Sequence, residues 1–195
     1  MPDIHSHERG LIETRIDGET LFEGNFLTLK RDRVRLPDGK EATREFLEHP
    51  GAVMVIPLFD DGQVLMERQF RYPLRQVMCE FPAGKLDADE SPLFCAQREL
   101  LEETGYSAGR WQRITRIHPV ISYSTEFIDI FLARDLSAGQ RQLDDGEFLE
   151  TFTMPATQLL DWVRCGQVSD VKTVIGAFWL EKILGGQWSP EPDAG

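Results

Sequence analysis

The sequence has little cysteine and no pattern that would use it as a cross-link or a metal ligand. Its three cysteines, Cys79, Cys95 and Cys165, are an odd number, lie far apart and have apolar neighbours. This spacing fits neither a disulfide framework nor a thiolate zinc site. We therefore predict that all three are small residues of the core.

Long apolar runs and a leader segment are also lacking. No stretch approaches the roughly 20 apolar residues that cross a bilayer as a helix, so no membrane partner is expected. The opening residues, MPDIHSHER, show no basic region followed by an apolar core, which would mark a secretory signal. The sequence therefore predicts a cytoplasmic protein.

Positive charge is scarce. The chain carries 21 Lys and Arg against 33 Asp and Glu, for a formal net charge of −12. A surface with this balance repels polyanions, so nucleic acid is not expected as a partner. The length of 195 residues suffices for one filled core with a small appendage.

The most informative segment of the sequence is residues 84–106, which combines helix-forming, helix-capping and acidic residues. Its second half, 92–104, is rich in helix formers, with Ser91 placed to cap it, Pro92 at the first helical position and Gly105 just past the end. This predicts a helix. Its expected buried stripe consists of Leu93, Ala96, Leu100 and Leu101.

Three carboxylates, Glu99, Glu102 and Glu103, share one surface of this predicted helix. Like charges at this spacing repel, and the C-terminal end of a helix disfavours anions. A row of hard oxygen ligands beside a loop suits Mg²⁺ or Mn²⁺, which would reverse that penalty. Taken alone, the pattern has an alternative interpretation as a solvated acidic face with Arg98 as ion partner.

The spacing of the whole stretch is more specific. Gly84 is followed after five residues by Glu90, and after seven more by the run RELLEETGY at residues 98–106. This arrangement resembles the signature of the Nudix hydrolases, with Tyr106 replacing an aliphatic residue at the last position. The preceding segment EFPAG, residues 80–84, resembles the ADP-ribose pyrophosphatase branch of that family.

The resemblance implies an α/β (α+β) fold, the Nudix α/β/α sandwich with a mixed β-sheet, plus a small N-terminal antiparallel β-subdomain. The expected divisions are 1–50 for the β-hairpin subdomain, 51–188 for the hydrolase domain and 189–195 for a disordered tail. In this branch such a subdomain pairs with a second subunit, so a homodimer is implied.

Strands are predicted from β-rich or alternating segments and helices from amphipathic ones. A turn at Asp17-Gly18 is expected to separate short strands within 11–23, a turn at 60–62 to make 64–70 the hairpin partner of 52–59, and residues 82–84 to turn beside the site. The further strands are 25–36, 41–48, 77–81, 111–120 and 127–133, and the further helices are 155–165 and 170–184.

The resemblance also assigns roles around the acidic helix. It implies two or three Mg²⁺ or Mn²⁺ ions held by Glu99, Glu103 and the carbonyl of Ala83, with Glu102 completing the shell. The supporting residues are Gly84, Glu90, Arg98 and Gly105. The spacing of Arg98 to Glu102 suits an ion pair that aims the ligands.

Substrate contacts and the general base are implied by position. Arg71, in the segment QFRYP, matches an arginine that meets a substrate phosphate, and Arg44 and Phe26 are candidates for the nucleotide site. Within the acidic segment 143–150, Glu147 best matches the base that positions the attacking water, with Glu150 next and a plain solvated turn as the alternative. Glu126 is either a contact to the sugar or a strand-start carboxylate facing water.

One segment departs from the branch. Members carry a proline about fifteen residues past the signature, where this chain has Ile121; Pro119 comes earlier and Ser122 replaces a glycine. This departure affects the prediction of the substrate more than the prediction of the reaction.

The leading prediction is metal-dependent hydrolysis of the pyrophosphate bond of a nucleoside diphosphate sugar, ADP-ribose foremost, to AMP and ribose 5-phosphate. GDP-mannose or another nucleotide sugar is the alternative, favoured by the missing proline. An ADP-ribose sensor without catalysis is the alternative from another class, and the intact set of carboxylates argues against it.

Overall fold

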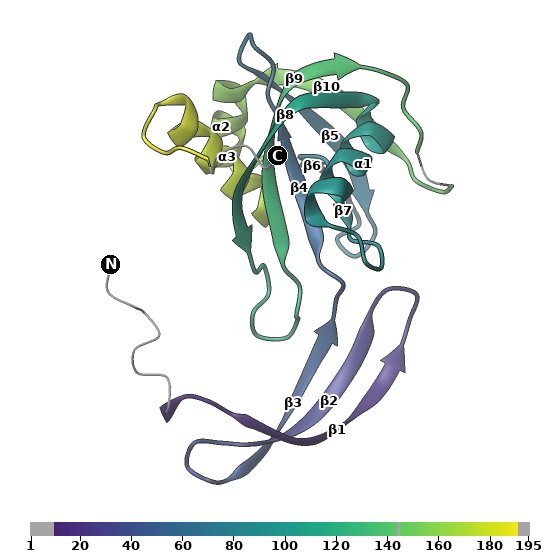
Figure 1. Ribbon diagram of the computed structural model, residues 1–195, viewed down its shortest axis with the longest axis vertical. Coiled ribbons are helices and arrows are strands. Elements are labelled where there is room, and N and C mark those ends of the chain that lie inside the picture. Colours follow the sequence, from purple (N-terminus) through teal and green to yellow (C-terminus); the bar gives the residue numbers. More distant parts are fainter. Residues whose placement is uncertain (1–9, 144, 191–195) are drawn as a thin grey trace. The chain divides into compact units, whose positions relative to one another are not determined.

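The computed structural model describes residues 10–143 and 145–190, which form two units (Figure 1). The smaller unit comprises residues 10–50 together with Val120–Glu126, and the larger unit comprises Gly51–Pro119 and the residues from Phe127 onward. Residues 191–195 of the expected tail, and Asp144 of the expected acidic loop, lie outside the described residues.

The smaller unit is an antiparallel sheet in the order β1-β2-β3. Its strands are β1 (Thr14–Glu23), β2 (Thr28–Arg35) and β3 (Glu41–Glu48). The predicted turn at Asp17-Gly18 is wrong, because β1 continues through it with a register shift between Arg15 and Asp17. Gly18 serves close approach instead: a Cβ there would lie 1.9 Å from Oδ1 of Asp32.

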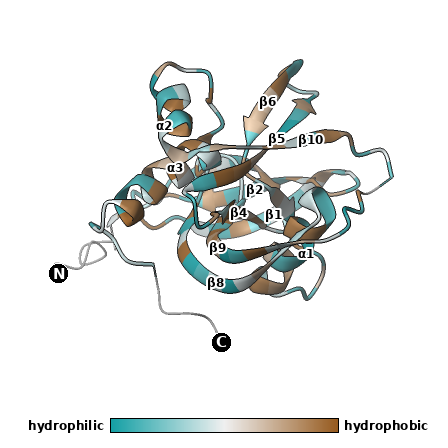
Figure 2. Ribbon diagram, turned by 90° about the horizontal axis from the view of Figure 1, so that it is seen from above, coloured by the Kyte–Doolittle hydropathy of each residue, from teal (hydrophilic) through white to brown (hydrophobic). Residues whose placement is uncertain are grey.

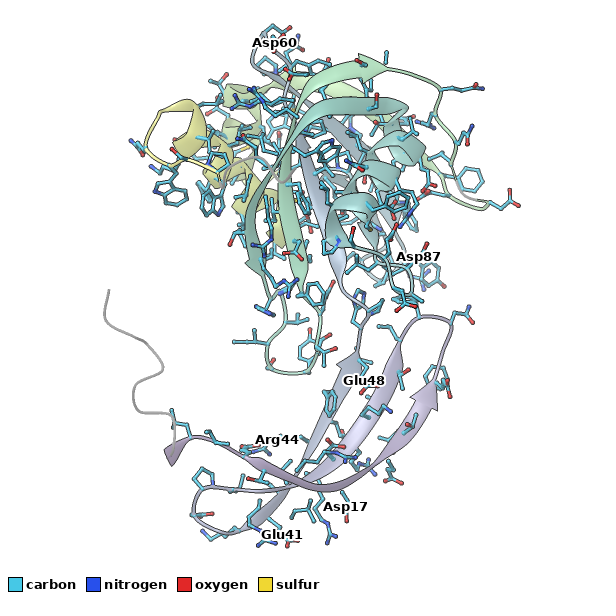
Figure 3. All side chains as sticks on the ribbon, viewed as in Figure 1. Asp17, Glu41, Arg44, Glu48, Asp60 and Asp87 are labelled. Carbon is cyan, nitrogen blue, oxygen red and sulfur yellow. The ribbon has the colours of Figure 1, made fainter. Side chains whose placement is uncertain are left out.

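Charged side chains cover this sheet, and Figure 3 shows Asp17, Glu41, Arg44 and Glu48 standing on its strands. Ion pairs link neighbouring strands, such as Arg31 to Glu45 at 2.6 Å. Exposed pairs of this kind contribute little stability each. The smaller unit therefore draws little stability from its charged surface.

The larger unit contains two sheets, of which the first has the order β7-β4-β9-β8. Its strands are β4 (Ala52–Pro57), β7 (Ala83–Lys85), β8 (Tyr106–Ile117) and β9 (Ile128–Ala138). β4 pairs with β9 in parallel, whereas β7 and β8 pair antiparallel with their neighbours, so the sheet is mixed as predicted. The predicted turn at 82–84 is partly wrong, because Ala83 and Gly84 belong to β7.

The second sheet has the order β10-β5-β6. Its strands are β5 (Gln63–Arg71), β6 (Gln76–Glu80) and β10 (Leu149–Pro155). The predicted turn at 60–62 is present, since the Gly62 N–H donates to Phe59 O at 3.0 Å and the Phe59 N–H donates to Gln63 O at 2.9 Å. The predicted pairing of strand 52–59 with 64–70 is wrong, because beyond this turn a single bridge, Leu58 to Val64, joins the two segments. The reason is that β9 and β7 already occupy both edges of β4.

Within the described part of the larger unit, three helices cover the sheets: α1 (Pro92–Thr104), α2 (Ala156–Arg164) and α3 (Val171–Leu184). Every residue of β4 is buried. Val53 and Val55 pack in one cluster with α1, whereas Met54 and Ile56 pack in another with α2 and α3. Because successive side chains of a strand point to opposite faces, the helices lie on both sides of the sheet, and the predicted sandwich is confirmed (Figure 1).

The packing corrects two details of the predicted core. Leu101 is 43% exposed, whereas Cys95 takes the expected buried place beside Ala96 and Leu100. Hydrophobic and hydrophilic segments alternate along α1 in Figure 2, as expected for a helix with one apolar face. Cys165 is exposed because it caps the end of α2, and only Cys95 among the cysteines is fully buried.

Among the described residues, no helix combines the length and the apolar composition needed to span a bilayer.

Candidate active site

The acidic helix α1 begins and ends where the sequence predicted. The Ser91 side chain accepts a hydrogen bond from the Phe94 N–H at 3.3 Å, and Pro92 occupies the first turn. Gly105 ends the helix in the left-handed conformation, with φ of 77°, and donates its N–H to Leu101 O at 2.8 Å. These caps account for the bounds of the helix, Pro92–Thr104.

Glu103 lies on the buried face of α1, where it is 3% exposed. Its carboxylate accepts the backbone N–H of Ala83 at 3.0 Å, which joins the helix to β7. Burial raises the pKa of Glu103 well above its usual value, and the negative charges of Glu67, Glu99 and Glu147 raise it further. The site thus concentrates negative charge away from water.

Glu99 lies against Gly84. A Cβ on Gly84 would come within 1.8 Å of the Glu99 carboxyl carbon, so the first glycine of the signature leaves room for the carboxylate. Burial raises the pKa of Glu99, although the charge and hydrogen bond of Arg98 oppose this effect.

Arg98 joins the other carboxylates of the signature. Its Nε donates to Glu90 Oε1 at 2.9 Å, and its Nη1 donates to Glu99 Oε1 at 2.8 Å and to Glu102 Oε2 at 3.0 Å. The predicted ion pair with Glu102 is therefore present. The hydrogen bond from Arg98 lowers the pKa of Glu90 to about 2, although burial partly opposes it, and Glu90 also accepts the Asp87 N–H at 3.0 Å.

The predicted metal ligands are not arranged as a metal-binding group. Within the described ranges, 10–143 and 145–190, no group of three His, Cys, Asp or Glu side chains is arranged to hold a metal ion. Glu99 and Glu102 turn toward Arg98, and Glu103 turns toward the Ala83 N–H. The metal roles of these residues, and of the Ala83 carbonyl, stay predictions.

The chemistry of the donors nevertheless fits a hard divalent cation. Glu103 is a buried carboxylate and Glu99 a partly buried one. Besides burial, the charges of neighbouring carboxylates raise the pKa of both, Glu102 and Glu147 acting on Glu99, and Glu67, Glu99 and Glu147 on Glu103. Both oxygens of the buried Glu67 lack a hydrogen-bond partner among the described residues. A divalent cation would stabilise the ionised form of all three side chains.

Arg71 is held by a carboxylate that the sequence analysis had not assigned to the site. Its Nε and Nη2 donate to the two oxygens of Glu80 at 2.6 and 2.9 Å, and Glu80 also accepts from Lys172 of α3. Burial raises the pKa of Glu80, but the hydrogen bonds and charges of Arg71 and Lys172 outweigh it and hold the pKa below its usual value. Glu80 stood within the EFPAG segment, whereas no local pattern singled out Lys172.

The two candidate bases are distinguished by the strand pairing. Gln69 Nε2 donates to Glu147 Oε1 at 3.2 Å, and the charge of Glu147 raises the pKa of Glu99 and Glu103. Glu150 lies opposite Arg68 in the β10–β5 register, on the other face of the sheet from Gln69. The arrangement favours Glu147.

The remaining candidates lie in the smaller unit. Arg44 Nε donates to Glu13 Oε2 at 2.8 Å, Phe26 contacts His49 edge to face with ring centroids 6.2 Å apart, and the Glu126 N–H donates to Ser124 Oγ at 3.1 Å. Their roles toward a substrate stay predictions.

A mixed sheet between helices, with a capped glutamate helix behind a glycine-containing strand, defines a Nudix-type hydrolase. Residues 48–170 match the family described as "NUDIX domain", and residues 13–47 match "Nucleoside diphosphate sugar hydrolase N-terminal domain". The chain belongs to the Nudix family and is a hydrolase of that family, as the sequence resemblance predicted.

Individual relatives agree with this assignment. The chain is 38% identical to an ADP-ribose pyrophosphatase of Bacillus subtilis, covering 89% of this chain and 95% of the relative. It is 34% identical to a methanol dehydrogenase activator of Bacillus methanolicus, covering 87% and 92%. A crystal structure of an ADP compounds hydrolase shares the fold, with a TM-score of 0.80 and 24% identity over 90% of this chain and 95% of that one.

Proposed function

We propose that the protein hydrolyses the pyrophosphate bond of a nucleoside diphosphate sugar, with ADP-ribose as the foremost substrate, to give AMP and ribose 5-phosphate. The observation that carries this proposal is the joint placement of acidic side chains and an oriented arginine: the buried Glu67 and Glu103, whose charges act on Arg71, together with the partly buried Glu99 on the same helix as Glu103. The likeness to the Bacillus subtilis ADP-ribose pyrophosphatase supports the choice of substrate.

The carboxylates would hold the cofactor. We assign two or three Mg²⁺ or Mn²⁺ ions to Glu99, Glu103 and the Ala83 carbonyl, with Glu102 completing the shell. When bound, these ions supply positive charge to the pyrophosphate and lower the pKa of a bound water. Arg98 aims Glu99 and Glu102 through its hydrogen bonds, and Gly84 leaves the space that Glu99 occupies.

The other residues bind the substrate and move a proton. Glu80 holds the Arg71 guanidinium at two points, so that its remaining N–H groups can donate to a phosphate. Glu147 accepts a proton from water as the water oxygen bonds to phosphorus and the bridging P–O bond breaks. Arg44, Phe26 and Glu126 are the proposed contacts to the nucleotide and sugar.

Turnover of a substrate panel tests the proposal. The purified chain with Mg²⁺ is mixed with ADP-ribose, GDP-mannose and other ADP- and GDP-sugars, and the products are separated by chromatography. We expect AMP and ribose 5-phosphate from ADP-ribose. No turnover on any member of the panel would overturn the proposal, and a preference for GDP-mannose would support the alternative suggested by Ile121 in place of proline.

We also propose that two chains associate through the smaller unit. The unit is a three-stranded sheet with most residues at least partly exposed, including Phe22 at 62% and Phe26 at 51%. Such sheets usually need a further apolar surface for stability. Light scattering on the purified chain tests this, since a monomer mass at micromolar concentration would contradict it.

A further inference from the structure

Glu67 is a buried carboxylate that lies on β5, outside the glutamate helix. It is 0% exposed, and neither of its carboxylate oxygens has a hydrogen-bond partner among the described residues. An unpartnered polar group in the interior loses the hydrogen bonds that water would provide, and a charged one loses more. Such a side chain requires a partner that compensates its burial.

The strand geometry directs Glu67 toward the active site. Because side chains alternate along a strand, Glu67, Gln69 and Arg71 line one face of β5. Gln69 reaches Glu147, and Arg71 binds Glu80. Glu67 also stands directly opposite Glu80 in the β5–β6 register, where cross-strand side chains project to the same side.

The negative charge of Glu67 acts on Glu103 of the glutamate helix. After burial, the negative charge of Glu67 is the largest influence that raises the pKa of Glu103, ahead of Glu99 and Glu147. The surrounding cations are engaged elsewhere: Lys172 binds Glu80 and Asp170, and Arg71 binds Glu80.

We propose that Glu67 is a direct ligand of a divalent cation, so that β5 contributes a buried carboxylate to the cation site in addition to those of α1. The ligand is a small, hard cation such as Mg²⁺ or Mn²⁺, because these ions prefer carboxylate oxygens. This inference rests on the proposed function only for what the cation does in the reaction. Binding of the cation by Glu67 does not depend on that function.

Binding of Mn²⁺ alone tests the proposal without substrate. The full chain is freed of metal and titrated with Mn²⁺, and free Mn²⁺ is followed by electron paramagnetic resonance. We expect Glu67→Gln to weaken binding at least about tenfold or to remove one bound ion, as loss of a carboxylate at a metal site does. Glu181→Gln, which removes an exposed carboxylate from α3, is the matched control and keeps the affinity of the unmodified chain.

Thermal unfolding in chelator separates a ligand from a structural group. Glu67→Gln keeps the shape of the side chain but cannot ionise, so we expect an unchanged or higher unfolding temperature without metal and a smaller rise on adding Mn²⁺. Mn²⁺ affinity and stoichiometry equal to those of the unmodified chain would overturn the proposal.

Crystals of the unmodified chain grown with Mn²⁺ decide the question if the variant does not fold. An anomalous peak within about 2.5 Å of a Glu67 oxygen supports the proposal, and peaks bonded to Glu99 and Glu103 but not to Glu67 overturn it. The substrate panel tests the proposed function independently of this inference. Mn²⁺ bound by Glu67 in a chain that hydrolyses no nucleotide sugar would refute the proposed function and leave this inference standing.

Discussion

Arg71 and Glu80 form a two-point ion pair across neighbouring strands, with N···O distances of 2.6 and 2.9 Å. Burial lowers the pKa of Arg71, but the hydrogen bond and charge of Glu80 outweigh it, so the guanidinium is firmly held in its charged form. Glu80 itself is 2% exposed and also binds Lys172. The arginine proposed to meet a phosphate is therefore oriented by a buried carboxylate.

Replacing Arg71 by Lys tests this orientation. A lysine ammonium cannot reproduce the parallel pair of hydrogen bonds, so we expect the KM for ADP-ribose to rise by roughly 10- to 100-fold, equivalent to about 1.5–3 kcal/mol for a charged hydrogen bond. Steady-state kinetics with Mg²⁺ measure it. Arg75→Lys is the control, because Arg75 stacks on Tyr72 in the neighbouring turn, with 3.6 Å from its guanidinium carbon to the ring centroid. An unchanged KM for Arg71→Lys would remove Arg71 from the binding site.

Glu103→Gln distinguishes the enzyme from a sensor. If Glu103 holds the catalytic cation, we expect kcat to fall by several orders of magnitude while binding of ADP-ribose, followed by calorimetry, is largely kept. Glu181→Gln again serves as the exposed control. A variant that retains the activity of the unmodified chain would contradict the role of Glu103, and an unmodified chain that binds ADP-ribose without turnover would favour the sensor.

Glu147 and Glu150 form a matched pair for identifying the base. Glu147 contacts Gln69, whereas Glu150 lies opposite Arg68 on the other face of the sheet. We expect Glu147→Gln to lower kcat by roughly 10²–10⁴-fold and Glu150→Gln to change it little. The opposite ranking of the two variants would assign the base to Glu150.

Gly84→Ala separates activity from stability. The added methyl group meets the flexible end of Glu99, within 1.8 Å of its carboxyl carbon, and not the backbone. We therefore expect the side chain to move aside, so that the unfolding temperature changes little while activity falls at least about tenfold. Circular dichroism and turnover are measured on the same sample. A fully active variant would show that the position of Glu99 is not critical.

Stability without metal should fall as the pH rises. Burial and the charge of Glu80 raise the pKa of Glu67 from 4.5 to about 8, so the folded chain keeps a proton that the unfolded chain releases between these values. The unfolded state then binds fewer protons, and the free energy of unfolding decreases across that window by up to about 1.4 kcal/mol per pH unit for one group. Glu103, whose pKa is also raised, acts in the same direction.

Urea unfolding in EDTA from pH 5 to 9 measures this dependence. Mg²⁺ should restore stability most strongly at the high-pH end, because it binds the ionised carboxylates. Glu67→Gln should flatten the profile in EDTA, with Glu181→Gln as control. A profile that rises between pH 5 and 8 in EDTA would contradict the assignment of raised pKa values.

Local chemistry made much of the fold predictable. The helix 92–104 was recognisable because its cap, its proline and its terminal glycine act within a few residues of one another. The strands 41–48 and 52–57 followed from β-rich or apolar runs bounded by turn residues. The pairing of strands was less accessible, and the expected pairing of 52–59 with 64–70 failed because two distant segments, β7 and β9, took the edges of β4.

The candidate site likewise has a part that the sequence predicts and a part that only the tertiary structure reveals. The sequence alone determined the family, the glutamate helix and its arginine, because their spacing is contiguous and α-helical geometry converts it directly into shared faces. Only the tertiary structure showed that Glu80 and Lys172 form one ion-pair network with Arg71, and that Glu67 lies buried on the same face of β5 as Arg71. These contacts join β5, β6 and α3, and long-range packing brings such segments together without leaving any period or motif along the chain.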